Sequence, residues 1–97
     1  IVMKKAYGFD ENGEKLNYYY VNESVGIACG FLITAIHNAG LVTLTHTPSP
    51  MNFLTEALNR PANERPYLLM PVGYPDKNAL VPDLKRKDLS EVVAYYE

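Results

Sequence analysis

Apolar residues are most concentrated between positions 25 and 36, and they would cover most of the circumference of a helix. The apolar positions are Val25, Ile27, Phe31, Leu32, Ile33 and Ile36. Asn22 precedes them as a good helix cap, and Glu23 lies favourably at the positive end of the helix dipole. Gly40 follows as a residue able to take the left-handed terminating conformation. The pattern predicts one helix ending near Asn38 and buried on nearly all sides.

Two glycines interrupt this apolar run four positions apart, at Gly26 and Gly30. On a helix they make one face flat, so that another backbone can approach closely. A chain of 97 residues has too little protein to wrap such a helix completely. We therefore expect a partner to cover part of it.

The first twenty residues show a strand-like pattern. Residues 1–7 and 15–20 flank the polar stretch 10–14, in which Asn12-Gly13 suits the positive backbone angles of a tight turn. A hairpin or an ordered loop is expected there.

The remaining elements are shorter. Ser49 can cap a second helix with Pro50 at its first position, ending at residues 59–61. Residues 67–72 form a continuous apolar run typical of a buried strand, closed by a turn at 73–75. Asp88 can cap a last helix, with Glu91 three residues later completing an arrangement like a capping box. The apolar residues at helical spacing there are Leu89, Val92, Val93 and Tyr96. The order of elements predicts an α+β fold.

Composition narrows the function classes. A formal charge of −2 and a pI near 5.6 argue against a nucleic-acid surface, which is usually strongly basic. The apolar run is too short for a bilayer, which needs about 20 residues. The single Cys29 cannot form an internal disulfide, so a reducing cytoplasm is expected. Cys29, His37 and His46 do not have the spacing of paired metal ligands, and no metal site is predicted.

Two segments carry candidate chemistry. Residues 40–50 run from the end of the long helix into a strand that presents Thr45, His46 and Thr47 before a Pro-marked corner. The second segment places Lys85-Arg86-Lys87 just before the terminal helix. Taken alone, alternating threonines are ordinary strand formers and a basic triplet is usually a solvated turn.

Together with residues 60–66 and 71–75, these segments resemble the C-terminal half of a nitroreductase-family flavoprotein. The resemblance extends from about Tyr18 to Val93 and is strongest to the branch that contains the iodotyrosine deiodinases. It implies that residues 1–97 are the C-terminal portion of one α/β sandwich domain. The N-terminal half, with the main phosphate cluster and the substrate lid, is expected before Ile1, so catalysis by these residues alone is doubtful.

The resemblance also implies an FMN site. Residues matching Thr45, His46 and Thr47 face the flavin ring in that family, and the Thr47 hydroxyl donates to the ring nitrogen that accepts hydride. Such a hydrogen bond tunes the cofactor, and it makes Thr47 the implied catalytic residue. Arg86 matches the C-terminal phosphate-binding arginine, whose guanidinium suits a phosphate.

The implied activity is that of an FMN-dependent oxidoreductase of the complete protein. It takes hydride from NADH or NADPH and reduces a nitroaromatic, a quinone or a halogenated phenol. The resemblance further implies a homodimer joined through the helix around Gly26–Ile36. The alternative is a truncated dimerisation or scaffold domain that has no cofactor and no enzymatic activity.

Overall fold

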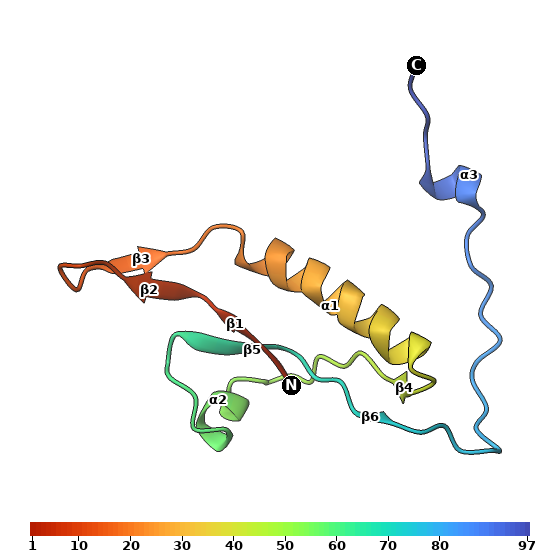
Figure 1. The fold of residues 1–97 in the computed structure, drawn as a ribbon, viewed down its shortest axis with the longest axis horizontal. Coiled ribbons are helices and arrows are strands. Elements are labelled where there is room, and N and C mark those ends of the chain that lie inside the picture. The colour runs from red at the N-terminus through yellow and green to blue at the C-terminus, as the bar shows by residue number, and fades with distance from the viewer.

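The computed structural model describes all 97 residues and contains three helices and six short strands (Figure 1). The strands are β1 (Val2–Lys5), β2 (Tyr7–Phe9), β3 (Lys15–Asn17), β4 (Val42–Thr43), β5 (Glu64–Leu68) and β6 (Val72–Gly73). The helices are α1 (Val21–Asn38), α2 (Phe53–Ala57) and α3 (Leu89–Val92). The mixture of helices and antiparallel strands confirms the predicted α+β class.

The N-terminal hairpin forms where the sequence predicts it. β2 pairs antiparallel with β3, and Gly13 takes a φ of 80° in the connecting turn. The Asp10 carboxylate accepts hydrogen bonds from the backbone amides of Asn12 and Glu14, both at 2.8 Å. The hairpin is shorter than the two predicted runs, because β1 belongs to a different sheet and residues 18–20 lead into α1.

β1 pairs antiparallel with β5, and β4 pairs antiparallel with β6, so each sheet has only two strands. The single strand predicted over residues 67–72 was therefore placed wrongly. β5 begins at Glu64 because β1 supplies its partner there, and it includes Pro66. A proline lacks the amide needed between two strands, and β5 accommodates Pro66 because it pairs on one side only.

Helix α1 begins and ends close to the predicted positions. Its last turn closes on Gly40, whose φ is 74°, with hydrogen bonds from Gly40 N to His37 O and from Leu41 N to Ile36 O. This is the Schellman pattern expected of a terminal glycine. The predicted cap at Asn22 is wrong, because the helix already includes Asn22.

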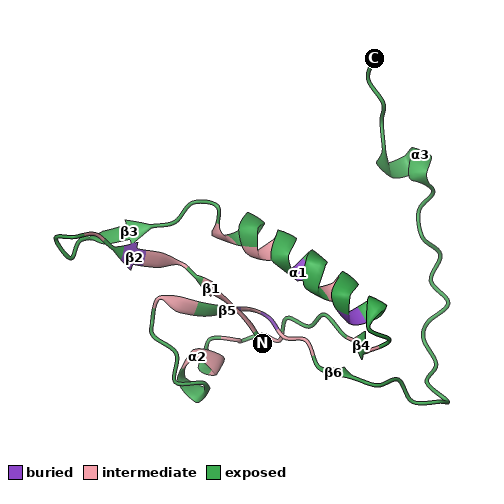
Figure 2. Cartoon of the chain, viewed as in Figure 1, coloured by how far each residue is buried: buried purple, intermediate pink, exposed green.

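The prediction that α1 is buried on nearly all sides is wrong for this chain. Only Cys29 and Ile36 are buried along the helix, whereas Ile27 and Phe31 remain 64% and 75% exposed. Figure 2 shows the long exposed face of the helix, with the buried positions on the side that faces the strands. The small core consists of these two residues and Leu68.

The two short helices are also less extensive than predicted. α2 begins at Phe53 after Asn52, so Ser49 does not cap it and Pro50 is not its first residue. At α3, the Asp88 amide donates to the Glu91 carboxylate at 2.9 Å, as the predicted capping box requires. α3 ends at Val92, which leaves Val93 and Tyr96 outside the helix, against the prediction.

After β6 the chain leaves the body of the molecule and continues away from it as an extended tail that carries α3 near its end (Figure 1). The Cα radius of gyration is 17.9 Å, against about 12–13 Å for a compact domain of this length. None of the helices combines the length and apolar content needed to cross a membrane.

Candidate functional site

The segment Thr45-His46-Thr47 is fixed by a single antiparallel bridge between His46 and Leu69. His46 N donates to Leu69 O and Leu69 N donates to His46 O, each at 2.9 Å. Just before this bridge, the Thr43 hydroxyl donates to Pro71 O at 2.7 Å. The backbone at His46 is therefore anchored to the chain segment between β5 and β6.

This anchoring involves only the backbone of His46 and leaves the polar groups of Thr45 and Thr47 without partners. All three residues of the segment are exposed, and the amides and hydroxyls of both threonines make no hydrogen bond within the chain. Backbone groups and side chains alternate along an extended strand. Thr45 and Thr47 thus present their side chains on the same face, and His46 presents its side chain on the opposite face.

An open hollow of about 460 Å³ adjoins the segment, lined by residues 42–44 and 71–73 of the β4–β6 pair. Thr45 and Thr47, whose amides and hydroxyls are unpaired, come directly after residues 42–44 in the chain. A flat heteroaromatic ring with acceptor atoms along its edge fits donors of this kind. Thr45 and Thr47 offer such unpaired donors beside this hollow.

Arg86 lies in the extended tail between β6 and α3 and is exposed. Its guanidinium forms no hydrogen bond and no ion pair with any group of the chain. The tail runs away from the segment that contains Thr47 (Figure 1). The structure therefore assembles the Thr45–Thr47 part of the predicted site and does not bring Arg86 to it.

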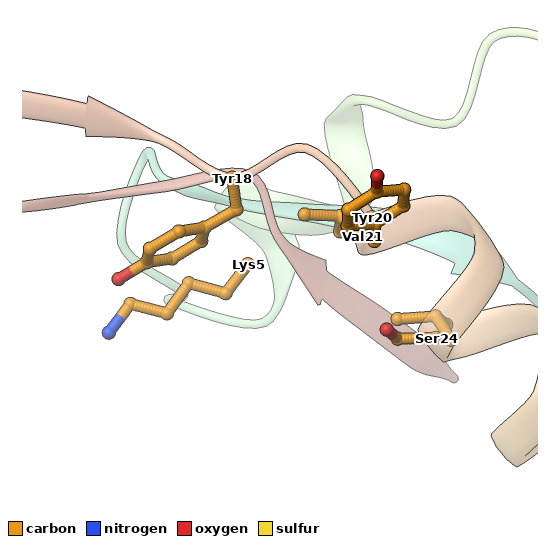
Figure 3. A pocket seen from close by; sticks show the side chains of 6 residues that line it. Lys5, Tyr18, Tyr20, Val21 and Ser24 are labelled. Atoms are coloured by element: carbon orange, nitrogen blue, oxygen red, sulfur yellow. The ribbon is translucent and has the colours of Figure 1, made fainter.

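A second cavity, of about 380 Å³, lies at the start of α1 and contains none of the predicted site residues. Figure 3 shows Lys5 and Tyr18 side by side at this cavity, with Ser24 on α1. It is lined mostly by apolar side chains and is widely open. No group of three or more His, Cys, Asp or Glu side chains is placed to hold a metal ion.

Comparison with known proteins identifies the relatives of this arrangement, although no protein-family model matches the sequence. The chain is 62% identical over 96 residues to an iodotyrosine deiodinase of Haliscomenobacter hydrossis, which covers 99% of the chain and 43% of that protein. It is 50% identical over 94 residues to human iodotyrosine deiodinase 1, covering 96% of the chain and 32% of the human protein. This chain is homologous to the C-terminal part of the iodotyrosine deiodinases.

A solved structure supports the same relationship. The chain superposes with a TM-score of 0.68 on oxidized iodotyrosine deiodinase bound to FMN and 3-iodo-L-tyrosine. The match has 32% sequence identity and covers 81% of this chain and 40% of the other. The fold is thus that of the deiodinases and of the wider nitroreductase group, as the resemblance implied. The chain spans less than half the length of the relatives it matches.

Leu69 is the residue of the candidate site that sequence reasoning missed. Its backbone holds His46, yet its side chain carries no chemistry that marks it. The apolar run around it signalled a strand, but a run of this kind does not say which segment it pairs with. Only the fold reveals that residues 46 and 69 are partners.

Proposed function

We propose that the complete protein is an FMN-dependent oxidoreductase that removes halogen from a halogenated phenol of the iodotyrosine class. The identity of 62% over 96 residues to a deiodinase carries this proposal. The solved neighbour, which was bound to FMN and 3-iodo-L-tyrosine, supports both the cofactor and the substrate class. Nitroaromatic compounds and quinones are the alternative acceptors.

Thr45 and Thr47 would contact the ring edge of FMN. Their free amides and hydroxyls lie on a backbone that the His46–Leu69 bridge already fixes, so binding costs little further ordering. The Thr47 hydroxyl would donate a hydrogen bond to the flavin ring nitrogen that accepts hydride. FMN, when bound, supplies the electrons for the reduction, and these protein groups orient it and set its electronic properties.

Arg86 would contact the FMN phosphate. Twelve residues separate it from Gly73, and an extended chain of that length spans roughly 40 Å. The tail is therefore long enough to bring a guanidinium to a phosphate near the ring site. A charge-assisted pair with the phosphate suits this side chain.

The net reaction requires two electrons and a proton. The carbon–halogen bond breaks, a carbon–hydrogen bond forms, and the halide ion leaves. A reduced nicotinamide is the electron donor that we propose, without a preference between NADH and NADPH.

Assembly as a homodimer through the α1 helix belongs to the same proposal. Ile27 and Phe31 on this helix are mostly exposed, and Gly30 has no atom within 4 Å of the position that a side chain would occupy. Each large apolar side chain that becomes fully buried stabilises association by about 1.5–3 kcal/mol. A second copy of the helix offers a matching apolar surface.

Turnover of a halogenated tyrosine by the purified complete protein tests this function. We expect flavin absorbance bands, and release of iodide and tyrosine from 3-iodotyrosine when NADPH or dithionite is supplied. Nitroaromatic and quinone acceptors in parallel assays rank the substrate classes. Protein that carries FMN but releases no iodide would contradict the substrate assignment.

A cofactor-free dimerisation or scaffold domain is the second candidate. Two observations favour it: the exposed face of α1, and the separation of Arg86 from the Thr45–Thr47 segment. A colourless protein that dimerises and does not take up added FMN would support this candidate over the first.

A further inference from the structure

The long connection between His46 and Leu69 is held together by contacts at two places. The His46–Leu69 bridge closes it at the site. Farther along, the end of α2 is fastened to the first residue of β5, and this second closure divides the loop into two parts. Only five residues lie between Thr47 and the start of α2 at Phe53.

The second closure begins with the C-terminus of α2. Asn59 takes a positive φ of 51°, Asn59 N donates to Glu56 O, and Arg60 N donates to Thr55 O. These bonds form a Schellman motif with asparagine in the place where glycine is usual. The motif fixes the backbone of Arg60.

The side chain of Arg60 then binds Glu64 through two parallel hydrogen bonds. Arg60 Nε lies 2.6 Å from Glu64 Oε2, and a terminal guanidinium nitrogen lies 2.9 Å from Glu64 Oε1. The Thr55 hydroxyl donates to the backbone carbonyl of Glu64 at 3.1 Å. Glu64 therefore receives a contact from α2 at its backbone and from the turn after α2 at its carboxylate, in an arrangement more specific than a simple ion pair.

Glu64 is also the first residue of β5, opposite Lys5 of β1. Five residues later the same chain reaches Leu69, which holds His46. Thr47 thus lies on a short path between two anchors, the bridge at His46 and the fastened helix α2. Releasing α2 would free one end of this path.

We propose that Arg60 and Glu64 are positioning residues for the FMN-contacting segment: their two-bond pair holds α2 against β5 and so fixes the backbone that follows Thr47. This inference rests on the proposed function. Neither residue touches the cofactor. They act on binding by setting the fraction of protein molecules in which the segment has the conformation that binds FMN. The apparent dissociation constant of FMN rises as that fraction falls.

The test compares Glu64→Gln with Glu56→Gln in the complete protein. Glu56 is a neighbouring, exposed glutamate whose side chain makes no hydrogen bond, so it controls for the loss of one charge. Arg60→Met and Arg65→Met form the matching pair for the cation, and Arg60→Lys keeps the charge but removes the two-bond geometry.

In the protein without cofactor, hydrogen exchange of residues 47–55 should accelerate in Glu64→Gln and Arg60→Met and stay unchanged in both controls. The dissociation constant of added FMN should rise about three- to fivefold in the same two variants, as it would if the competent population fell to about a quarter. Arg60→Lys should give an exchange rate and a dissociation constant between those of Arg60→Met and the unmodified protein. The potential of flavin once bound should stay that of the unmodified protein, because these residues change only the competent population. Faster exchange confined to residues 47–55 distinguishes this effect from a general loss of stability.

Two failures can be distinguished. Unmodified protein that binds no FMN overturns the proposed function. Protein that binds FMN with equal affinity in Glu64→Gln and Glu56→Gln, and with equal exchange in residues 47–55, overturns the positioning role alone. If Glu64→Gln does not fold, Arg60→Lys decides the matter by the same two measurements.

Discussion

His46 and Leu69 exchange both of their backbone hydrogen bonds, although 22 residues lie between them in the chain. This exchange uses the backbone of His46 and leaves the amides of Thr45 and Thr47 without partners. The site thus combines a fixed centre with open donors on both sides. The predictions for this segment follow from that division.

Thr47→Ala should leave FMN affinity in the complete protein nearly unchanged and should alter the redox potential of the bound flavin. The substitution removes one hydroxyl donor at the ring and leaves the phosphate contacts intact. Isothermal titration and a redox titration separate the two quantities. An unchanged potential would remove Thr47 from the site.

Arg86→Ala should weaken FMN binding by about 10- to 100-fold, because a hydrogen bond to a charged group is worth about 1.5–3 kcal/mol. Lys87→Ala serves as the control, since it removes a nearby positive charge that the proposal does not assign to the phosphate. Equal affinities for the two variants would show that the tail contributes only a general electrostatic field.

Gly30→Leu should weaken self-association without harming the fold of one chain. Nothing in these 97 residues lies within 4 Å of a Cβ placed at Gly30, so a leucine there has room within the chain and would obstruct a closely packed second helix. Sedimentation or light scattering measures the effect, with Gly30→Ala as a small-residue control. An unmodified protein that stays monomeric at low micromolar concentration would contradict the dimer.

Gly26 should behave differently from Gly30, because a Cβ there would lie 3.1 Å from the Tyr67 hydroxyl of the same chain. Gly26→Ala gains about 1 kcal/mol of helix propensity but forces this hydroxyl to move. That hydroxyl makes a long hydrogen bond of 3.3 Å to Asn22 O. Thermal unfolding should show Gly26→Ala to be more stabilising in a Tyr67→Phe background, and additive effects would exclude the contact.

Acid should weaken the closure of the loop between α2 and β5. Hydrogen bonding from Arg60, aided by the charges of Arg60 and Lys5, lowers the pKa of Glu64 below its ordinary value of 4.5. A carboxyl with a lower pKa in the folded state stabilises the fold above its unfolded pKa, and this stabilisation is lost as the pH falls through the folded value.

The same pairing raises the pKa of Arg60, which stays charged throughout this range. The difference in melting temperature between unmodified protein and Glu64→Gln should therefore be largest near neutral pH and should shrink below about pH 4.5. A difference that is independent of pH would show that the ion pair does not contribute.

Local signals in the sequence predicted the elements that local interactions determine. The turn at Gly13 and the helix end at Gly40 both form, because each depends on a backbone conformation that glycine favours. The capping arrangement of Asp88 and Glu91 forms for a similar reason, since its two residues lie three positions apart.

The errors arise where distant segments determine the outcome. Asn22 was predicted to cap α1, but its side chain instead accepts a hydrogen bond from Lys4 of β1 at 2.8 Å. The helix begins one residue earlier, at Val21. β5 begins at Glu64 because of its pairing with β1, which no local pattern announces.

The same limit applies to the candidate site. The strand character of the Thr45–Thr47 segment was visible in the sequence, whereas its attachment to Leu69 was not. The phosphate contact of Arg86 came from family resemblance alone, and it stays a prediction.

The pairing of β1 with β5 has a consequence for how the chain folds. Lys5 and Glu64 are adjacent in the sheet but are separated by about sixty residues, so a long loop must close before they meet. During synthesis, the hairpin of β2 and β3 and the helix α1 are complete long before β5 exists. Within these 97 residues β1 has no other strand partner, so its pairing with β5 belongs to the late and slow part of folding.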